Sequence, residues 1–137
     1  MLRQLKVKGF KSLADVKVSF PRLTVLFGPN AAGKSNLLDA VQALSRIGTS
    51  RTLSDALSEP IRGYPTEAFA LPQGGLSELL SMNESHLSLE AELAIEKDLY
   101  CYRLGLAIQP GSGGLSVTDE YLAALNFKGE PRGSPTI

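Results

Sequence analysis

The sequence predicts an α/β fold in which a helix covers a mixed β-sheet and an antiparallel β hairpin or meander is added to it. Two observations lead to this prediction. A short apolar run at 23–27 is followed by a glycine-rich loop and then by apolar residues at helical spacing over 34–47, which is the order strand, loop, helix. After residue 85 the pattern changes to alternating apolar and polar residues, typical of strands with one buried face.

The amino-terminal elements follow from these patterns. Residues 5–8 and 16–20 alternate in polarity and are predicted to be half-buried strands joined by a turn over 9–15. The run 23–27 has no polar alternation beyond Thr24, which indicates a central strand covered on both faces. A helix is expected over 34–47, with Gly48 placed at its carboxyl-terminal cap.

The carboxyl-terminal half is predicted to be mainly strand. Residues 48–76 are rich in Gly, Ser, Thr and Pro and are expected to form a long variable insertion with a short helix near 53–57. A further helical turn is expected at 76–82. Strands over 87–95 and 100–108 form a hairpin, and 115–118 pairs back onto it. The last ten residues, 128–137, are expected to be an irregular tail, so 1–137 is interpreted as one lobe.

Composition bounds the class of protein. The chain has 137 residues, 43% of them hydrophobic, which suits one globular domain. No apolar run approaches the roughly 20 residues of a membrane helix, and the first residues lack the apolar segment of a signal peptide. The single cysteine, Cys101, lies in an alternating strand and is expected to be a buried structural thiol. A cytoplasmic location is predicted, because an internal disulfide is impossible.

The net charge is zero, but its distribution is uneven. Residues 1–51 carry nine Lys or Arg and two Asp or Glu, a charge of +7 that residues 52–137 balance. A basic half favours a polyphosphate ligand. The lysines alternate along the expected strands and do not cluster, so solvated strand faces explain most of them. DNA is conceivable as a partner, but the sequence gives it no further support.

The loop between strand and helix spells G-x-x-x-x-G-K-S, the phosphate-binding P-loop or Walker A pattern. Gly28 and Gly33 allow a tight turn and a close approach to phosphate, while the loop amides and the helix start attract anions. Lys34 is the candidate catalytic cation for the β and γ phosphates, and the Ser35 hydroxyl is the candidate Mg²⁺ ligand. The expected nucleotide-binding residues of the loop are Gly28, Pro29, Asn30, Ala31, Ala32, Gly33, Lys34, Ser35 and Asn36.

Two stretches, 5–13 (LKVKGFKSL) and 28–40 (GPNAAGKSNLLDA), carry a family resemblance. The chain resembles the chromosome-maintenance (SMC), RecF and OLD-like ATPases over 2–47, and more loosely over 85–127. These proteins are P-loop NTPases with ABC-ATPase-like head lobes, often grouped with AAA-family ATPases. The resemblance implies ATP and Mg²⁺ as ligands, ATP hydrolysis by the complete protein, and a head-to-head homodimer.

The resemblance also implies roles for Lys11 and Ser12, since family members bring the matching turn residues to the nucleotide. From the residues alone, a solvated turn lysine is the preferred interpretation of Lys11, and it is the resemblance that favours a role at the nucleotide. Asn30 and Asn36 match the family's loop and are expected to shape the loop and the helix start.

Several parts of such an ATPase are not found in the sequence. There is no apolar strand ending in Asp-Glu, no L-S-G-G-type signature and no late switch histidine. His86 reads as a surface residue, and Gln109 is a weak candidate for the Mg²⁺-sensing glutamine. We therefore expect an amino-terminal part of a longer ATPase that is inactive alone.

Two alternative functions stay open from the sequence. The first is a nucleotide-binding or interaction module that does not hydrolyse ATP. The second is a small-molecule kinase or GTPase. It is disfavoured because an antiparallel hairpin follows the helix and no Asn-Lys-x-Asp tetrapeptide is present.

Overall fold

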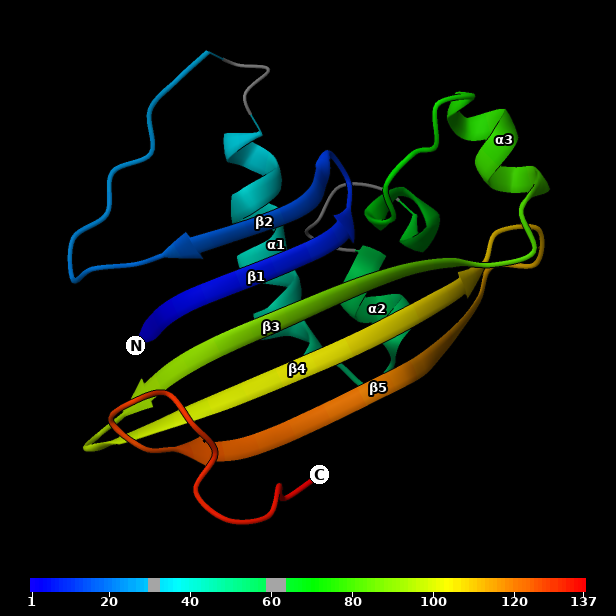
Figure 1. Ribbon diagram of the computed structural model, residues 1–137. Helices are drawn as coiled ribbons and strands as arrows, with labels where there is room; N and C mark the ends of the chain where they lie inside the picture. The colour runs from blue at the N-terminus through cyan, green and yellow to red at the C-terminus, as the bar shows by residue number, and fades with distance from the viewer. Residues whose placement is uncertain (30–32, 59–63) are drawn as a thin grey trace.

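The computed structural model describes residues 1–29, 33–58 and 64–137 (Figure 1). The amino-terminal elements are β1 (Leu2–Phe10), β2 (Leu13–Ser19) and α1 (Lys34–Ile47). Three short helical segments follow: α2 (Leu53–Ser58), η1 (Pro65–Ala68) and α3 (Gly75–Ser81). The chain then forms β3 (Ser85–Ile95), β4 (Asp98–Gln109) and β5 (Gly114–Leu125).

These strands form one five-stranded sheet in the order β2-β1-β3-β4-β5. Every neighbouring pair is antiparallel, and β1 lies between β2 and β3. The register aligns Val7 with Leu89 and Leu89 with Leu104, so these apolar side chains share one face. Because side chains alternate along a strand, the polar residues between them lie on the opposite face.

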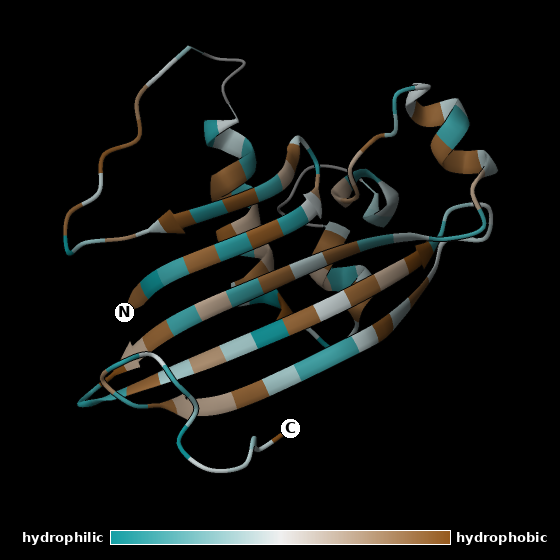
Figure 2. Ribbon diagram, in the orientation of Figure 1, coloured by the Kyte–Doolittle hydropathy of each residue, from teal (hydrophilic) through white to brown (hydrophobic). Residues whose placement is uncertain are grey.

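The two faces of the sheet differ sharply. Helices α1 and α2 lie behind the sheet in Figure 1, and the strands alternate in hydropathy in Figure 2. The opposite face carries ion pairs across the strands: Lys6 with Glu90 at 2.6 Å and Arg103 with Asp119 at 2.5 Å. The core on the helix side is formed by Leu5, Val7, Phe10, Leu37, Ala40, Ala43, Leu57, Phe69, Leu87, Leu89, Leu104, Leu106 and Ile108.

Most of the expected elements are confirmed. Helix α1 has the predicted bounds, and α2 and α3 lie where short helices were expected. The β3–β4 hairpin is present, with its turn at Glu96 and Lys97. Strand β5 pairs back onto β4 as expected, and it extends to Leu125.

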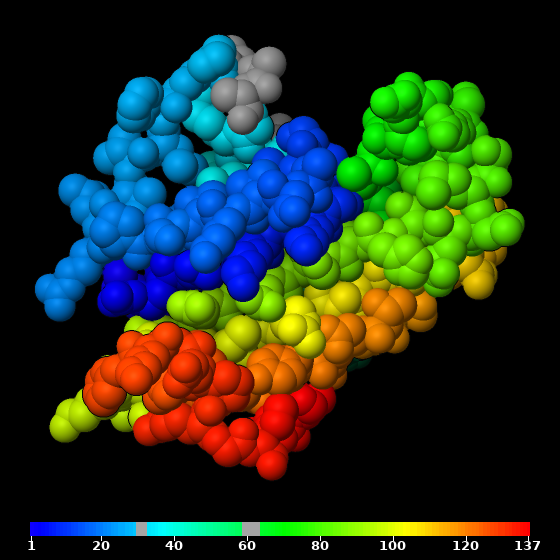
Figure 3. Space-filling model, viewed as in Figure 1, coloured from blue at the N-terminus to red at the C-terminus, as the bar shows by residue number. Residues whose placement is uncertain are grey.

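The prediction of a mixed sheet with a buried strand at 23–27 is wrong. The sheet is antiparallel, and this segment is neither helix nor strand. Its side chains are open to solvent: Leu23 is 82%, Val25 71% and Phe27 89% exposed. After β2 the chain arches away from the sheet and returns to begin α1 (Figures 1 and 3). The apolar run therefore finds no neighbouring strand in the described part of the chain.

The expected insertion and tail both make defined contacts. In the 48–76 segment, Leu57 and Phe69 are buried in the core, and Ala70 N donates to Gly9 O at 2.8 Å. In the 128–137 tail, Arg132 N and Thr136 N bond to the β5 carbonyls of Ala124 and Leu122, each at 2.7 Å. Among the described helices, none combines the length and apolar character needed to cross a membrane.

Candidate phosphate-binding site

The loop backbone has the shape that its glycines permit. Gly28 has φ 150° and Gly33 has φ 89°, both in the positive region that L-residues with a Cβ rarely adopt. Gly33 precedes α1 as its N-cap, and Leu37 N donates to Gly33 O at 2.9 Å, which begins the helix. The predicted binding residues Asn30, Ala31 and Ala32 lie outside the described residues. The loop thus leads directly to the amino-terminal end of the 14-residue helix α1, and this end of a helix attracts anions.

Lys34 points back over the loop. Its Nζ donates to the carbonyl oxygens of Gly28 and Pro29, the latter at 3.0 Å. The ammonium therefore lies beside the backbone that opens the loop, on the side of the helix start. Both acceptors are neutral oxygens, and a charged phosphate oxygen is a stronger acceptor for an ammonium group.

The Lys11-Ser12 turn is bound to the start of α1. Asn36 Nδ2 donates to Ser12 Oγ at 2.6 Å. A Cβ added at Gly33 would be 3.4 Å from Ser12 Oγ, so the turn directly borders the end of the loop. The structure thus brings together two regions that the sequence separates by more than twenty residues. Ser35 lies in the first turn of α1, as predicted.

Lys11 is more constrained than a solvated turn lysine. Its Nζ lies 2.7 Å from Asp39 Oδ2, and the two side chains are only 16% and 11% exposed. The residue has φ 48°, and its N–H donates to Ala68 O at 2.9 Å. Sequence reasoning gave Asp39 no role. The sequence did contain one indication of a role for Asp39: it follows Ser35 by four residues, so the two side chains lie on the same face of the helix.

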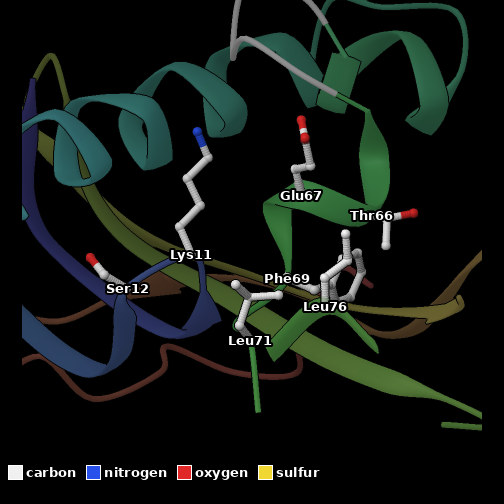
Figure 4. Close-up of a pocket in the computed structure, with 7 residues that line it drawn as sticks. All are labelled: Lys11, Ser12, Thr66, Glu67, Phe69, Leu71 and Leu76. Atoms are coloured by element: carbon white, nitrogen blue, oxygen red, sulfur yellow. The ribbon is translucent and has the colours of Figure 1, made fainter. Parts of the chain in front are cut away.

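A cavity of about 620 Å³ adjoins this turn. Figure 4 shows Lys11 and Glu67 extending in one direction, while the apolar lining residues gather on the other side of the view. Glu67 Oε2 also accepts the Tyr64 N–H at 2.9 Å, which fixes the start of η1. The sequence did not predict this cavity, because it depends on how the 64–76 segment folds against β1. Its lining residues are Lys11, Ser12, Thr66, Glu67, Phe69, Leu71 and Leu76.

The remaining candidates do not join the site. His86 is exposed, and its Nε2 lies 3.3 Å from Glu84 Oε2. Gln109 bonds to Ser112 within the β4–β5 turn, at 3.4 Å. Burial, with the nearby carboxylates of Glu90 and Glu92, raises the pKa of the Cys101 thiol. The residue is only half-buried, so the expectation of a buried thiol is not met.

A metal ion at this site would depend on the nucleotide as well as the protein. Within the described residues there is no group of three or more His, Cys, Asp or Glu side chains that could hold one. The donor set fits Mg²⁺ in the manner of a P-loop, where a hydroxyl joins phosphate oxygens and water. Ser35, the predicted Mg²⁺ ligand, lies in the first turn of α1.

Comparison with known families agrees with the class that the loop and helix define. The sequence model of a family described as an AAA ATPase domain matches residues 1–99. The chain belongs to this family of ATPase domains. The match includes the phosphate loop, α1, the 48–76 segment and β3.

Individual relatives match the amino-terminal part. The DNA replication and repair protein RecF of Ligilactobacillus salivarius is 42% identical over 55 residues, covering 39% of this chain and 14% of RecF. RecF of an Arthrobacter species is 35% identical over 86 residues, covering 59% and 21%. The chromosome partition protein Smc of Rhodopirellula baltica is 50% identical over 44 residues, covering 31% and 4%. The chain thus matches about a fifth or less of the length of these relatives, and the expected kinship with SMC and RecF proteins is confirmed.

Proposed function

We propose that this chain binds ATP with Mg²⁺ at residues 28–36 and that the complete polypeptide hydrolyses the bound ATP. The orientation of Lys34 carries the proposal. Its ammonium lies over a loop whose glycines both have positive φ, at the amino-terminal end of α1. A cation and the positive end of a helix dipole at one place favour a ligand with several phosphate charges.

Each residue has a distinct part in this proposal. Lys34 exchanges its carbonyl partners for phosphate oxygens and stabilises charge on the β and γ phosphates. Ser35 would hold Mg²⁺ through its hydroxyl, and the ion would supply positive charge for the phosphate oxygens. Lys11 and Ser12 approach the phosphates from the side, since their turn is bonded to α1 through Asn36.

The adjoining cavity supports a nucleotide over a free phosphate. At about 620 Å³ it lies within the range of roughly 300–1,000 Å³ usual for small-ligand sites, and it shares Lys11 and Ser12 with the phosphate region. Phe69 and Leu71 give it an apolar side, and Thr66 and Glu67 give it polar groups. We infer that the base and ribose of ATP enter this cavity.

Hydrolysis needs groups that the described residues do not supply at the site. A water-positioning residue and a charge stabiliser beyond the γ phosphate are required. The carboxylates of the sheet are engaged elsewhere: Glu90 and Asp119 with Arg103, and Glu120 with the Tyr102 hydroxyl at 3.0 Å. We therefore assign these groups to further segments of a longer cytoplasmic protein and to a second copy in a head-to-head homodimer.

The same observation favours a second candidate function. A module that binds ATP without hydrolysing it needs the phosphate loop and the cavity but no water-activating carboxylate. It differs from the leading proposal in one measurable property, the release of phosphate from bound ATP.

The test is ATP binding by calorimetry to the complete polypeptide and to its Lys34→Ala variant. The variant is expected to lose ATP binding, while Lys8→Ala, a change on an exposed strand residue, keeps it. Unchanged affinity in Lys34→Ala would show that the loop is not the site. Phosphate release at the background rate, with binding intact, would select the non-hydrolysing module.

A further inference from the structure

We propose that Asp39 is a positioning residue for ATP binding, which holds the Lys11 ammonium on the face of α1 that leads to the phosphate loop. The inference rests on the proposed function and assigns a role to a residue that the loop motif does not include. Its structural basis is the 2.7 Å contact between Lys11 Nζ and Asp39 Oδ2.

The helix geometry places the relevant groups next to Asp39. Ser35 and Asn36 precede Asp39 in α1 by four and three residues, so each of them neighbours Asp39 on the helix surface. Asn36 bonds to Ser12, and Asp39 bonds to Lys11. The turn after β1 is thereby fixed to α1 at two successive points, and the cation of the turn lies along the face that starts with the candidate Mg²⁺ ligand.

The energetics argue against a purely structural ion pair. With side chains 16% and 11% exposed, both charges have lost most of their water. Replacing such a pair by apolar residues is often neutral or stabilising, so burial of a pair is weak support for a stabilising role. Lys11 also has φ 48°, a conformation that costs a non-glycine residue energy and is found disproportionately at functional sites.

Fixing the ammonium has a direct consequence for binding. A free lysine side chain must lose rotamer freedom when it meets a phosphate, whereas Asp39 has already ordered Lys11. Several other contacts of Lys11 help to hold the turn, among them its backbone bond to Ala68 O and the Phe10 ring 5.8 Å from Nζ. Asp39 is the described carboxylate that determines where the charge lies, so removing its charge weakens polyphosphate binding through Lys11.

The readout that isolates this role is the preference for ATP over AMP. Both nucleotides share the base, ribose and α phosphate, so their affinity ratio reports contacts with the β and γ phosphates. Calorimetric titrations of the complete polypeptide with each nucleotide are compared for wild type, Asp39→Asn, Lys11→Met and the double variant. Asp98→Asn is the matched control, because Asp98 forms an exposed 2.8 Å pair with Arg132 away from the loop.

We expect Asp39→Asn and Lys11→Met each to lower the ATP-to-AMP affinity ratio about tenfold, as loss of one charge-assisted hydrogen bond predicts. Because Asp39 acts through Lys11, the double variant lowers the ratio no further than Lys11→Met alone. The Asp98→Asn control leaves the ratio unchanged. A melting temperature that falls in Asp39→Asn while the ratio stays at the wild-type value would overturn the proposal.

The swapped pair, Lys11→Glu with Asp39→Lys, keeps the test decisive if Asp39→Asn does not fold. The swap restores opposite charges across the contact but places a carboxylate on the turn. Stability is expected to recover while the ATP-to-AMP ratio stays low. Recovery of the ratio with the swapped pair would show that the pair is structural only. ATP binding that is unchanged in Lys34→Ala would instead contradict the proposed phosphate site itself, and with it the role of Asp39 in phosphate binding.

Discussion

At the scale of single residues, Gly9 in β1 is tightly constrained by the backbone of β3. It has φ 68°, and a Cβ there would be 2.4 Å from His86 O in β3. We expect Gly9→Ala to lower the free energy of unfolding by more than about 2 kcal/mol, because it combines an unfavourable φ with a clash against backbone. Urea unfolding measures this. Gly111→Ala is the control, since nothing lies within 4 Å of a Cβ there, and its effect should stay within about 0.5 kcal/mol. Similar midpoints for the two variants would contradict the close packing of β1 on β3.

The thiol of Cys101 gives a second residue-scale prediction. Burial and the neighbouring Glu90 and Glu92 raise its pKa, so the folded protein holds less thiolate at pH 8 than a solvated cysteine does. Alkylation by iodoacetamide should therefore be slow at pH 8 and accelerate as the pH rises through the raised pKa. Unfolding in urea should remove the protection. Equal rates in the folded and urea-unfolded protein would show that the thiol is not shielded.

The sequence predicted the site residues that a motif carries and missed those that depend on tertiary contact. Lys34 and the two loop glycines have fixed spacing, and their chemistry can be read directly. Asp39 could be recognised as acidic, but its pairing with Lys11 requires β1 and α1 to be packed together. The cavity has the same origin, since Phe69 and Leu76 reach Lys11 only after the 64–76 segment folds back.

At the scale of elements, α1 shows how a predicted helix uses its faces. Ala40 and Ala43 are fully buried between helix and sheet, whereas Leu38 is 59% exposed. Ala40→Leu should cost about 1–3 kcal/mol through overpacking, despite the good helix propensity of leucine. Leu38→Ala should change stability by less than about 0.5 kcal/mol. Thermal unfolding of both variants tests this, and a larger loss in Leu38→Ala would mean that another layer covers that side of α1.

The elements also differ in how well their sequences specify them. The β3–β4 hairpin was predictable because period-two alternation indicates which face of each strand is buried, and a short turn between the strands determines how they pair. The 23–27 segment has no such alternation. An apolar run indicates burial on both faces, but it does not identify the neighbours that provide it. Its predicted strand therefore depended on partners that the described sheet does not contain.

At the scale of the whole molecule, one apolar segment of the lobe, residues 23–27, remains exposed to solvent. The antiparallel sheet buries its apolar face under α1 and α2, and its ion pairs occupy the other face. Apolar side chains of 23–27 stand in solvent beside the phosphate loop. A soluble lobe rarely exposes such a run unless something covers it. This is consistent with the proposal that further segments complete the ATPase.

Expressed on its own, the 1–137 chain should therefore self-associate and hydrolyse ATP only at background. Leu23, Val25 and Phe27 are the source of the first effect, because unpaired extended apolar backbone recruits other chains. Replacing Leu23 and Val25 by Lys should shift the chain toward monomer in size-exclusion chromatography with light scattering. Leu80→Lys, on the half-exposed surface of α3, should leave the association unchanged.

Hydrolysis by the isolated 1–137 chain should stay at background, because the described residues offer a phosphate loop and one hydroxyl for Mg²⁺ but no free carboxylate beside them to position water. Mg²⁺-dependent hydrolysis by a monomeric 1–137 chain that disappears in Lys34→Ala would contradict the proposal that the water-positioning group comes from outside this chain. It would direct the search for the catalytic carboxylate to Glu90, Glu92, Asp119 and Glu120.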